Sequence, residues 1–167
     1  MADIEHAVEQ TYCRAPLAKS FNKTPLVSWI PNINISFSKR FGRDTAFSAS
    51  TDYQSGRPDA EARRLGCVID VECKAAFGKF YLREWSSAQR NWCLHNSDSS
   101  RTPYYLAVYL AEQRGISGEI YLVPSCVIRE AAYKSVDCLS IKEIWSEFCL
   151  KRGDNGLYVI KPDLWSK

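Results

Sequence analysis

The sequence predicts an α/β fold, with a mixed central β-sheet flanked by helices in a single domain over residues 1–167. Helical and strand-like patterns alternate along the chain, from an N-terminal helix through several strands to a late helix. A chain of 167 residues can bury one substantial core but not two comfortable ones. Its composition, 46% hydrophobic and 25% charged, is ordinary for a globular protein.

The first half of the chain is predicted to begin with a short helix. Residues 3–12 place apolar side chains at helical spacing, with Glu5 and Glu9 one turn apart on one flank. Pro16, Pro25 and Pro31 then interrupt the chain. Residues 34–38 alternate as a strand does, and they form the first predicted strand.

A β-hairpin follows, because the turn-like Arg63-Arg64-Leu65-Gly66 joins a short segment to a clear strand from Cys67 to Ala75. The remaining elements are predicted from periodicity, capping residues and turn residues. They are Phe80-Tyr81-Leu82, a helix from about Trp85 to His95, strands at Tyr104–Leu110 and Glu119–Val123, a helix from Ser140 to before Gly153, and a strand at Leu157–Ile160. The last two make up a C-terminal part over 138–162, beside a core over about 45–125.

No stretch approaches the roughly 18 consecutive apolar residues that a membrane span needs, and the acidic N-terminus does not have the pattern of a signal peptide. The seven cysteines contain no CxxC pair, and an odd number does not suit a complete set of disulfides. We therefore expect a cytoplasmic protein without a membrane partner, with reduced and mostly buried thiols.

The charge is unevenly distributed. The net charge is +3, but residues 14–90 carry 13 Lys and Arg against 7 Asp and Glu. A phosphate-binding surface and a merely solvated face both fit this bias. The run Lys39, Arg40 and Arg43, with Arg57 further on, is the candidate DNA-phosphate contact, and a plain exposed loop is the alternative.

The strand after the hairpin turn carries the candidate chemistry. Side chains alternate along a strand, so Asp70, Glu72 and Lys74 share one face. The opposite face, from Cys67 to Cys73, is apolar and is predicted to meet the core. Three ionisable groups are costly to cover with apolar material, so we expect their face to line solvent, a cleft or a metal site.

This set suits phosphodiester hydrolysis, which uses a cation to neutralise the phosphate and to lower the pKa of an attacking water. Mg²⁺ is held by carboxylates, and Glu72 with an upstream aspartate supplies them. Lys74 then orients or deprotonates the water and stabilises the developing charge. An exposed, salt-bridged strand face is the alternative for a Glu-x-Lys pair.

Two further residues strengthen the catalytic interpretation. Asp59 lies thirteen residues before Glu72, across the hairpin. On the helix predicted from Trp85, Gln89 interrupts an otherwise apolar face. That amide either places a water or substrate near the sheet or is a buried amide satisfied by the backbone.

In this order, Pro58-Asp59, Glu72-Cys73-Lys74 and a helix with Gln89 resemble the PD-(D/E)XK nuclease superfamily. With Ser50-Thr51-Asp52-Tyr53 and the strands through Pro124, the chain is most similar to the RecU-type Holliday junction resolvases. The resemblance covers roughly residues 1–130 and implies a restriction-endonuclease-like core. It also implies a homodimeric, Mg²⁺-dependent (or Mn²⁺-dependent) endonuclease acting on DNA junctions.

The resemblance carries over directly to Glu72 and Lys74, whereas the metal-binding aspartate has two candidates. The Ser-Thr-Asp-Tyr match indicates Asp52, and the thirteen-residue spacing indicates Asp59. Asp59 is favoured, because Asp52 needs a seven-residue extension of the hairpin. Glu5 resembles the N-terminal helix glutamate that assists metal binding in this superfamily, with Glu9 as its substitute.

The chain departs from the resolvases because no long basic stalk is evident between its N-terminal helix and its hairpin strands. Junction selectivity therefore stays open. Homing and restriction-type endonucleases share the same core, and a non-catalytic DNA-binding module is a further alternative.

Overall fold

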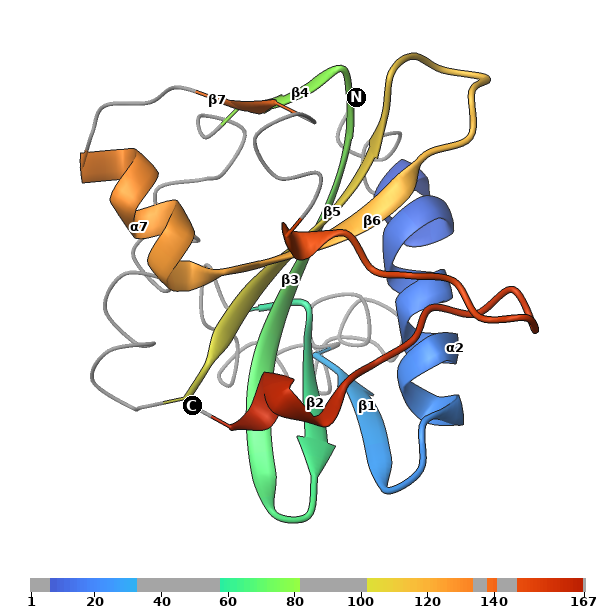
Figure 1. Ribbon diagram of the computed structural model, residues 1–167, viewed down its shortest axis with the longest axis vertical. Coiled ribbons are helices and arrows are strands. Elements are labelled where there is room, and N and C mark those ends of the chain that lie inside the picture. The colour runs from blue at the N-terminus through green and yellow to red at the C-terminus, as the bar shows by residue number, and fades with distance from the viewer. Residues whose placement is uncertain (1–6, 33–57, 82–101, 134–137, 141–146, 167) are drawn as a thin grey trace, which may run out of the picture.

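The computed structural model describes residues 7–32, 58–81, 102–133, 138–140 and 147–166. Their centre is a five-stranded sheet in the order β1-β2-β3-β5-β6 (Figure 1). The strands are β1 (Val27–Pro31), β2 (Ala60–Arg64), β3 (Cys67–Phe77), β5 (Tyr104–Ala111) and β6 (Glu119–Pro124). Only the β3–β5 pair is parallel, whereas the other neighbours are antiparallel. The predicted α/β class with a mixed sheet is confirmed.

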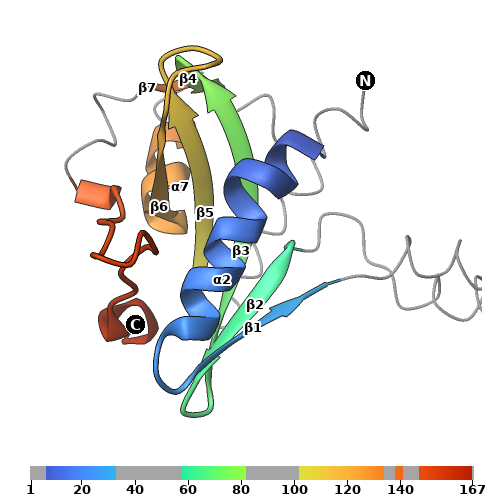
Figure 2. The same cartoon turned by 90° about the vertical axis from the view of Figure 1, so that its right-hand side faces the viewer.

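Helices lie on both sides of this sheet, with α2 (Ala15–Lys23) on one side and α7 (Ser125–Tyr133) on the other (Figure 2). Side chains of β5 alternate between the two cores. Tyr105, Ala107 and Tyr109 pack with α2, whereas the even-numbered residues pack with α7. Every residue of β5 is buried, as expected for a strand covered on both faces.

The N-terminal helical segment runs through residues 7–23, past the end at Tyr12 that the sequence predicts. Proline lacks an N–H and clashes with the carbonyl four residues earlier, so Pro16 was expected to break the helix. A π-helical turn, η1 (Gln10–Arg14), absorbs the clash, because the N–H of Ala15 donates to the more distant carbonyl of Gln10. The segment therefore continues from the middle strands β3 and β5, which η1 contacts, to the edge strand β1, which α2 contacts.

The hairpin between β2 and β3 has the predicted turn. Leu65 and Gly66 have φ angles of 50° and 83°, which are the positive values that a two-residue type I′ turn requires. This turn sets the register in which Arg64 pairs with Cys67 and Ala60 with Val71. β2 begins at Ala60, opposite Val71. In the described part of the chain, no strand pairs with that edge of β3 beyond Val71.

Several sequence predictions are corrected. The strand at Leu157–Ile160 is a single bridge between Arg152 and Tyr158, followed by a 3₁₀ turn, η4 (Pro162–Trp165). Neither β1 nor α7 was predicted. Cys67 and Cys126 are exposed, because Cys67 adjoins the hairpin turn and therefore lies outside the core.

A second, two-stranded sheet joins β4 (Lys79–Tyr81) to β7 (Cys138–Ser140). β4 contains Phe80 and Tyr81 of the segment Phe80-Tyr81-Leu82, for which neither a helix nor a strand was predicted. Ser140 was expected to cap a helix, but it pairs with Lys79 at the end of β7. Residues 141–146 of that predicted helix, and the strand at 34–38, lie outside the described residues, whereas the predicted end of the helix is wrong, because Cys149 bridges to Tyr121 and Arg152 to Tyr158.

No helix among the described residues is long and apolar enough to cross a membrane.

Candidate active site

The register of the hairpin brings Asp59 to Glu72. Ala60 and Val71 are the last paired residues, so Asp59 and Glu72 are the next two positions on the facing strands. The backbone before Asp59 is held by Asn32, just after β1. The side-chain amide of Asn32 donates to the carbonyl of Pro58 at 2.7 Å, and its backbone N–H donates to the carbonyl of Asp59 at 2.8 Å. The thirteen-residue spacing therefore has a structural cause in the length of this hairpin.

The side chain of Asp59 turns toward β3. Its Oδ2 accepts a hydrogen bond of 2.8 Å from the backbone N–H of Cys73, in the place where a longer β2 would have continued the ladder. Its Oδ1 lies 3.7 Å from Nη1 of Arg14. Asp59 is therefore fixed from two directions while its side chain stays partly exposed, at 22%.

Glu72 is buried, with 1% of its surface exposed. Burial raises its pKa well above the ordinary value, and the charge of Asp59 and a side-chain hydrogen bond with Asp59 raise the pKa further. Two carboxylates in contact repel each other when both are ionised, so the pair holds either a proton or a cation between its members. Of the three settings expected for this face, solvent, a cleft or a metal site, the burial of Glu72 excludes open solvent for this residue.

Lys74, two residues further along β3, is drawn to the N-terminal helix. Its Nζ lies 3.6 Å from Oε2 of Glu9, and the other oxygen of Glu9 accepts from Nη2 of Arg14 at 3.2 Å. Burial raises the pKa of Glu9, although Lys74 opposes this. Glu9, the substitute for Glu5, thus joins the cluster.

Arg14 and Asn32 belong to the site, and sequence reasoning missed both. Arg14 bridges Glu9 and Asp59, and Asn32 holds the backbone around Asp59. Arg14 lies beyond the predicted end of the first helix, and its five-residue spacing from Glu9 suits a π-helical turn rather than an α-helix. Asn32 follows an unpredicted strand, and no local pattern marked it.

The other predicted site residues lie outside the described residues. They are Glu5, Asp52 and Gln89, together with the candidate DNA contacts Lys39, Arg40, Arg43 and Arg57.

The donor set suits a hard cation. Among the described residues, no three His, Cys, Asp or Glu side chains form a group that could hold a metal ion. Mg²⁺ needs fewer protein ligands, because it is usually bound by one or two carboxylates and keeps several waters. Asp59 and Glu72 provide two carboxyl groups in contact. When both are charged they repel each other, and a cation bound between them would relieve that repulsion.

No protein-family model and no curated protein matches the chain.

Proposed function

We propose that this chain is a metal-dependent DNA endonuclease with a PD-(D/E)XK-type site formed by Asp59, Glu72 and Lys74. The observation that carries the proposal is the contact between Asp59 and the buried Glu72, with Lys74 two residues further along the same strand. A salt-bridged surface strand, the bland alternative, does not account for a buried glutamate held against an aspartate.

In this proposal Asp59 and Glu72 hold Mg²⁺, or Mn²⁺ in its place. The bound ion supplies charge neutralisation at the phosphate and a lowered pKa for the attacking water. For that role Glu72 must give up its proton, which its burial and the charge of Asp59 oppose. The hydrogen bond from Cys73 holds Asp59 in position.

The ammonium group of Lys74 orients the attacking water or stabilises the charge developing on the phosphate. Its present partner, Glu9, competes with substrate for the ammonium group. Arg14 counters this by holding Glu9 on its other oxygen. The ion-pair network therefore positions Lys74 next to the carboxylate pair before DNA arrives.

The substrate class follows from the resemblance to RecU-type resolvases, and we propose a Holliday junction. Asp52, Glu5 and Gln89 are secondary candidates for metal binding or for placing a water, and Lys39, Arg40, Arg43 and Arg57 for phosphate contacts. Symmetric resolution requires two nicks on opposite strands, so the active form is proposed to be a homodimer with one site in each subunit. Sedimentation of the protein with and without a junction tests this.

The function is tested with a panel of labelled DNAs incubated with Mg²⁺ or with EDTA: a mobile four-way junction, a flap, a single strand and random duplex. Symmetric, Mg²⁺-dependent nicking of the junction is expected. Cleavage at one long duplex sequence would indicate a homing or restriction-type enzyme of the same fold. Salt-sensitive binding without metal-dependent nicking would overturn the endonuclease and leave a DNA-binding module.

A further inference from the structure

A hollowed surface lies beside the candidate active site, over the rings of Tyr12 and Tyr109. Two cavities meet there, of about 360 Å³ and about 450 Å³. Tyr12, Tyr109 and Ser117 line both of them, so the two cavities adjoin at these residues. Together they are named the tyrosine groove.

The tyrosine groove contains a ring that is both fixed and exposed. Tyr12 stacks on Tyr109, with ring centroids 5.0 Å apart and planes inclined by 24°. Tyr109 is buried, and its hydroxyl accepts a hydrogen bond of 2.9 Å from the N–H of Gly118. Tyr12 is 45% exposed, so it presents part of an aromatic surface already held in place by its neighbour.

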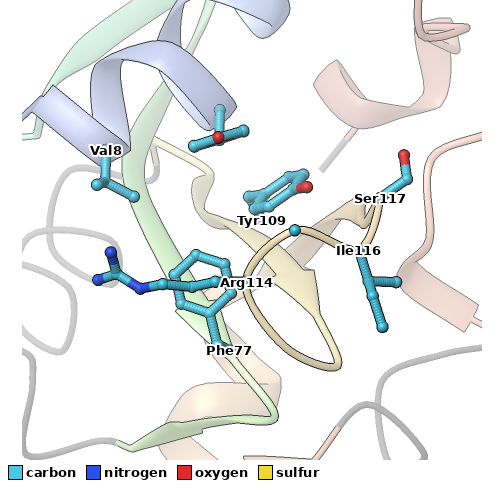
Figure 3. A pocket seen from close by; sticks show the side chains of 8 residues that line it. Val8, Phe77, Tyr109, Arg114, Ile116 and Ser117 are labelled. Atoms are coloured by element: carbon cyan, nitrogen blue, oxygen red, sulfur yellow. The ribbon is translucent and has the colours of Figure 1, made fainter.

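The charged side chains that line the groove in the described part of the chain are all cationic. Arg114 lies across the ring of Phe77, with its guanidinium carbon 5.1 Å from the ring centroid (Figure 3). Lys19 and Arg152 line the second cavity. Arg152 is already paired with Glu119, so Arg114 and Lys19 are the cations placed to meet a ligand.

A fixed aromatic ring flanked by cations is the combination that binds single-stranded nucleic acid, because bases stack on rings and phosphates pair with cations. We propose that the tyrosine groove binds an unpaired DNA strand, with one base stacked on Tyr12 and adjacent phosphates near Arg114 and Lys19. This inference rests on the proposed function, since it assumes that DNA is the substrate.

The location supports a role in substrate choice. Phe77 follows Lys74 by three residues on β3, about 10 Å along an extended strand, and its side chain lies on the α2 side of the sheet, opposite to the face of Glu72 and Lys74. Val8, at the same end of the groove, directly precedes Glu9, which contacts Lys74. The groove therefore meets the proposed cleavage site through Val8 and Glu9, and a strand bound there would favour DNA with an opened or displaced strand over intact duplex.

The test is fluorescence anisotropy of a labelled thymidine oligomer of about 12 nucleotides, with the full chain in EDTA so that no cleavage occurs. Tyr12→Ala is expected to weaken binding roughly 5-fold or more, while Tyr12→Phe keeps the ring and the affinity. Arg114→Ala should reduce the slope of log affinity against log salt by roughly 0.7, the value for one lost phosphate contact. Arg63→Ala, an exposed arginine beside the hairpin turn, is the matched control and should change neither.

Wild-type affinity for the oligomer in both Tyr12→Ala and Arg114→Ala would overturn the proposal that the tyrosine groove binds DNA. An equal loss of affinity in Arg63→Ala would overturn it as well. If Tyr12→Ala fails to fold, Tyr12→Leu retains apolar packing on Tyr109 and answers the same question. Cleavage of junction DNA in Mg²⁺ separates the two proposals. If the protein cleaves junctions but binds the oligomer independently of Tyr12 and Arg114, only the groove proposal is refuted. If binding depends on Tyr12 but no cleavage occurs, only the endonuclease proposal is refuted.

Discussion

At the residue scale, two effects that act in the same direction raise the pKa of the Glu72 carboxyl group well above its ordinary value. Burial disfavours its charged form, and Asp59 adds negative charge beside it. A cation reverses both effects, because it favours the charged form and separates the two carboxylates. We therefore expect metal binding at this pair to release a proton and to strengthen as pH rises.

The stability of the metal-free protein should depend on pH through Glu72. Its folded-state pKa lies well above the ordinary 4.5, so the folded protein keeps a proton that the unfolded chain releases. The free energy of unfolding therefore falls as pH rises above 4.5, by up to about 1.4 kcal/mol per pH unit, until the folded-state pKa is passed. Urea unfolding in EDTA from about pH 5 to about pH 8 measures this window.

Glu72→Gln is the matched variant, because it keeps the shape of the side chain and removes the titrating proton. The stability of the wild type relative to this variant should decline across the window. A difference that stays constant with pH would contradict the account of Glu72.

Mg²⁺ should raise the unfolding temperature of the wild type by mass action, by an amount equivalent to about 2.7 kcal/mol when the free ion is at a hundred times its dissociation constant. Asp59→Asn removes one carboxylate and should abolish most of this shift, and the wild-type shift should be larger at higher pH. Differential scanning fluorimetry provides the measurement. An equal shift in wild type and Asp59→Asn would place the metal elsewhere.

Local sequence predicted Glu72 and Lys74 and favoured Asp59, because alternation within one strand and the length of one hairpin govern their positions. The cations and amides around them were not predictable in this way. Arg14 and Asn32 reach the site through a helix that passes Pro16 and a strand that no pattern marked. Contacts of that kind depend on how the elements pack.

At the element scale, the close return of β5 into β6 depends on a glycine. A Cβ at Gly118 would clash with the carbonyl oxygen of Leu110 and lie 2.8 Å from Cβ of Ala111. The N–H of Gly118 also anchors the Tyr109 hydroxyl. The turn of the β2–β3 hairpin uses glycine differently, since Gly66 has a φ of +83° but open space around its Cα.

Gly118→Ala should therefore destabilise the protein by about 1–3 kcal/mol, the range for forcing an extra methyl group into packed surroundings. Gly66→Ala, which meets only the backbone penalty of a positive φ, should cost about 1 kcal/mol. Urea unfolding of the two variants side by side measures both. A larger loss in Gly66→Ala than in Gly118→Ala would contradict the packing at Gly118.

Four strands were predictable, because alternation, continuous apolar runs and turn residues mark them in the sequence. They are β2 and β3 of the hairpin, and the strands β5 and β6. The end of the first helix was not predictable, because a π-turn absorbs the proline that normally ends a helix. The helix α7 was not predictable either. Its apolar residues Val127, Ile128 and Ala131 pack into a core formed with distant strands, and that contact is not visible in the local sequence. Tertiary packing decided each of these cases.

At the scale of the whole molecule, the C-terminal segment closes the core on the α2 side of the sheet. Trp165 packs edge-on against Phe21 of α2, and its indole N–H donates to the carbonyl of Ala62 on β2 at 3.0 Å. Phe21 also contacts Trp29 on β1. Both ends of the described chain therefore stabilise the hairpin that positions Asp59 and Glu72.

Trp165→Ala should lower the free energy of unfolding by about 3–5 kcal/mol, as for other buried large aromatic residues. Trp165→Phe keeps much of the packing and loses the hydrogen bond, so the loss should be smaller. Urea denaturation checks both variants. Equal stability of Trp165→Ala and the wild type would mean that the C-terminal segment does not close the core.

Asp59, Glu72 and Lys74 are proposed to form a metal-dependent site for cleaving DNA. The most direct test of this proposal is the single-turnover cleavage rate on four-way junction DNA in Mg²⁺, measured for wild type, Glu72→Gln, Lys74→Ala and the distant control Arg63→Ala. The wild type and the control should cleave alike, and the two site variants should be at least roughly 100-fold slower. Unchanged cleavage in both Glu72→Gln and Lys74→Ala would contradict the account.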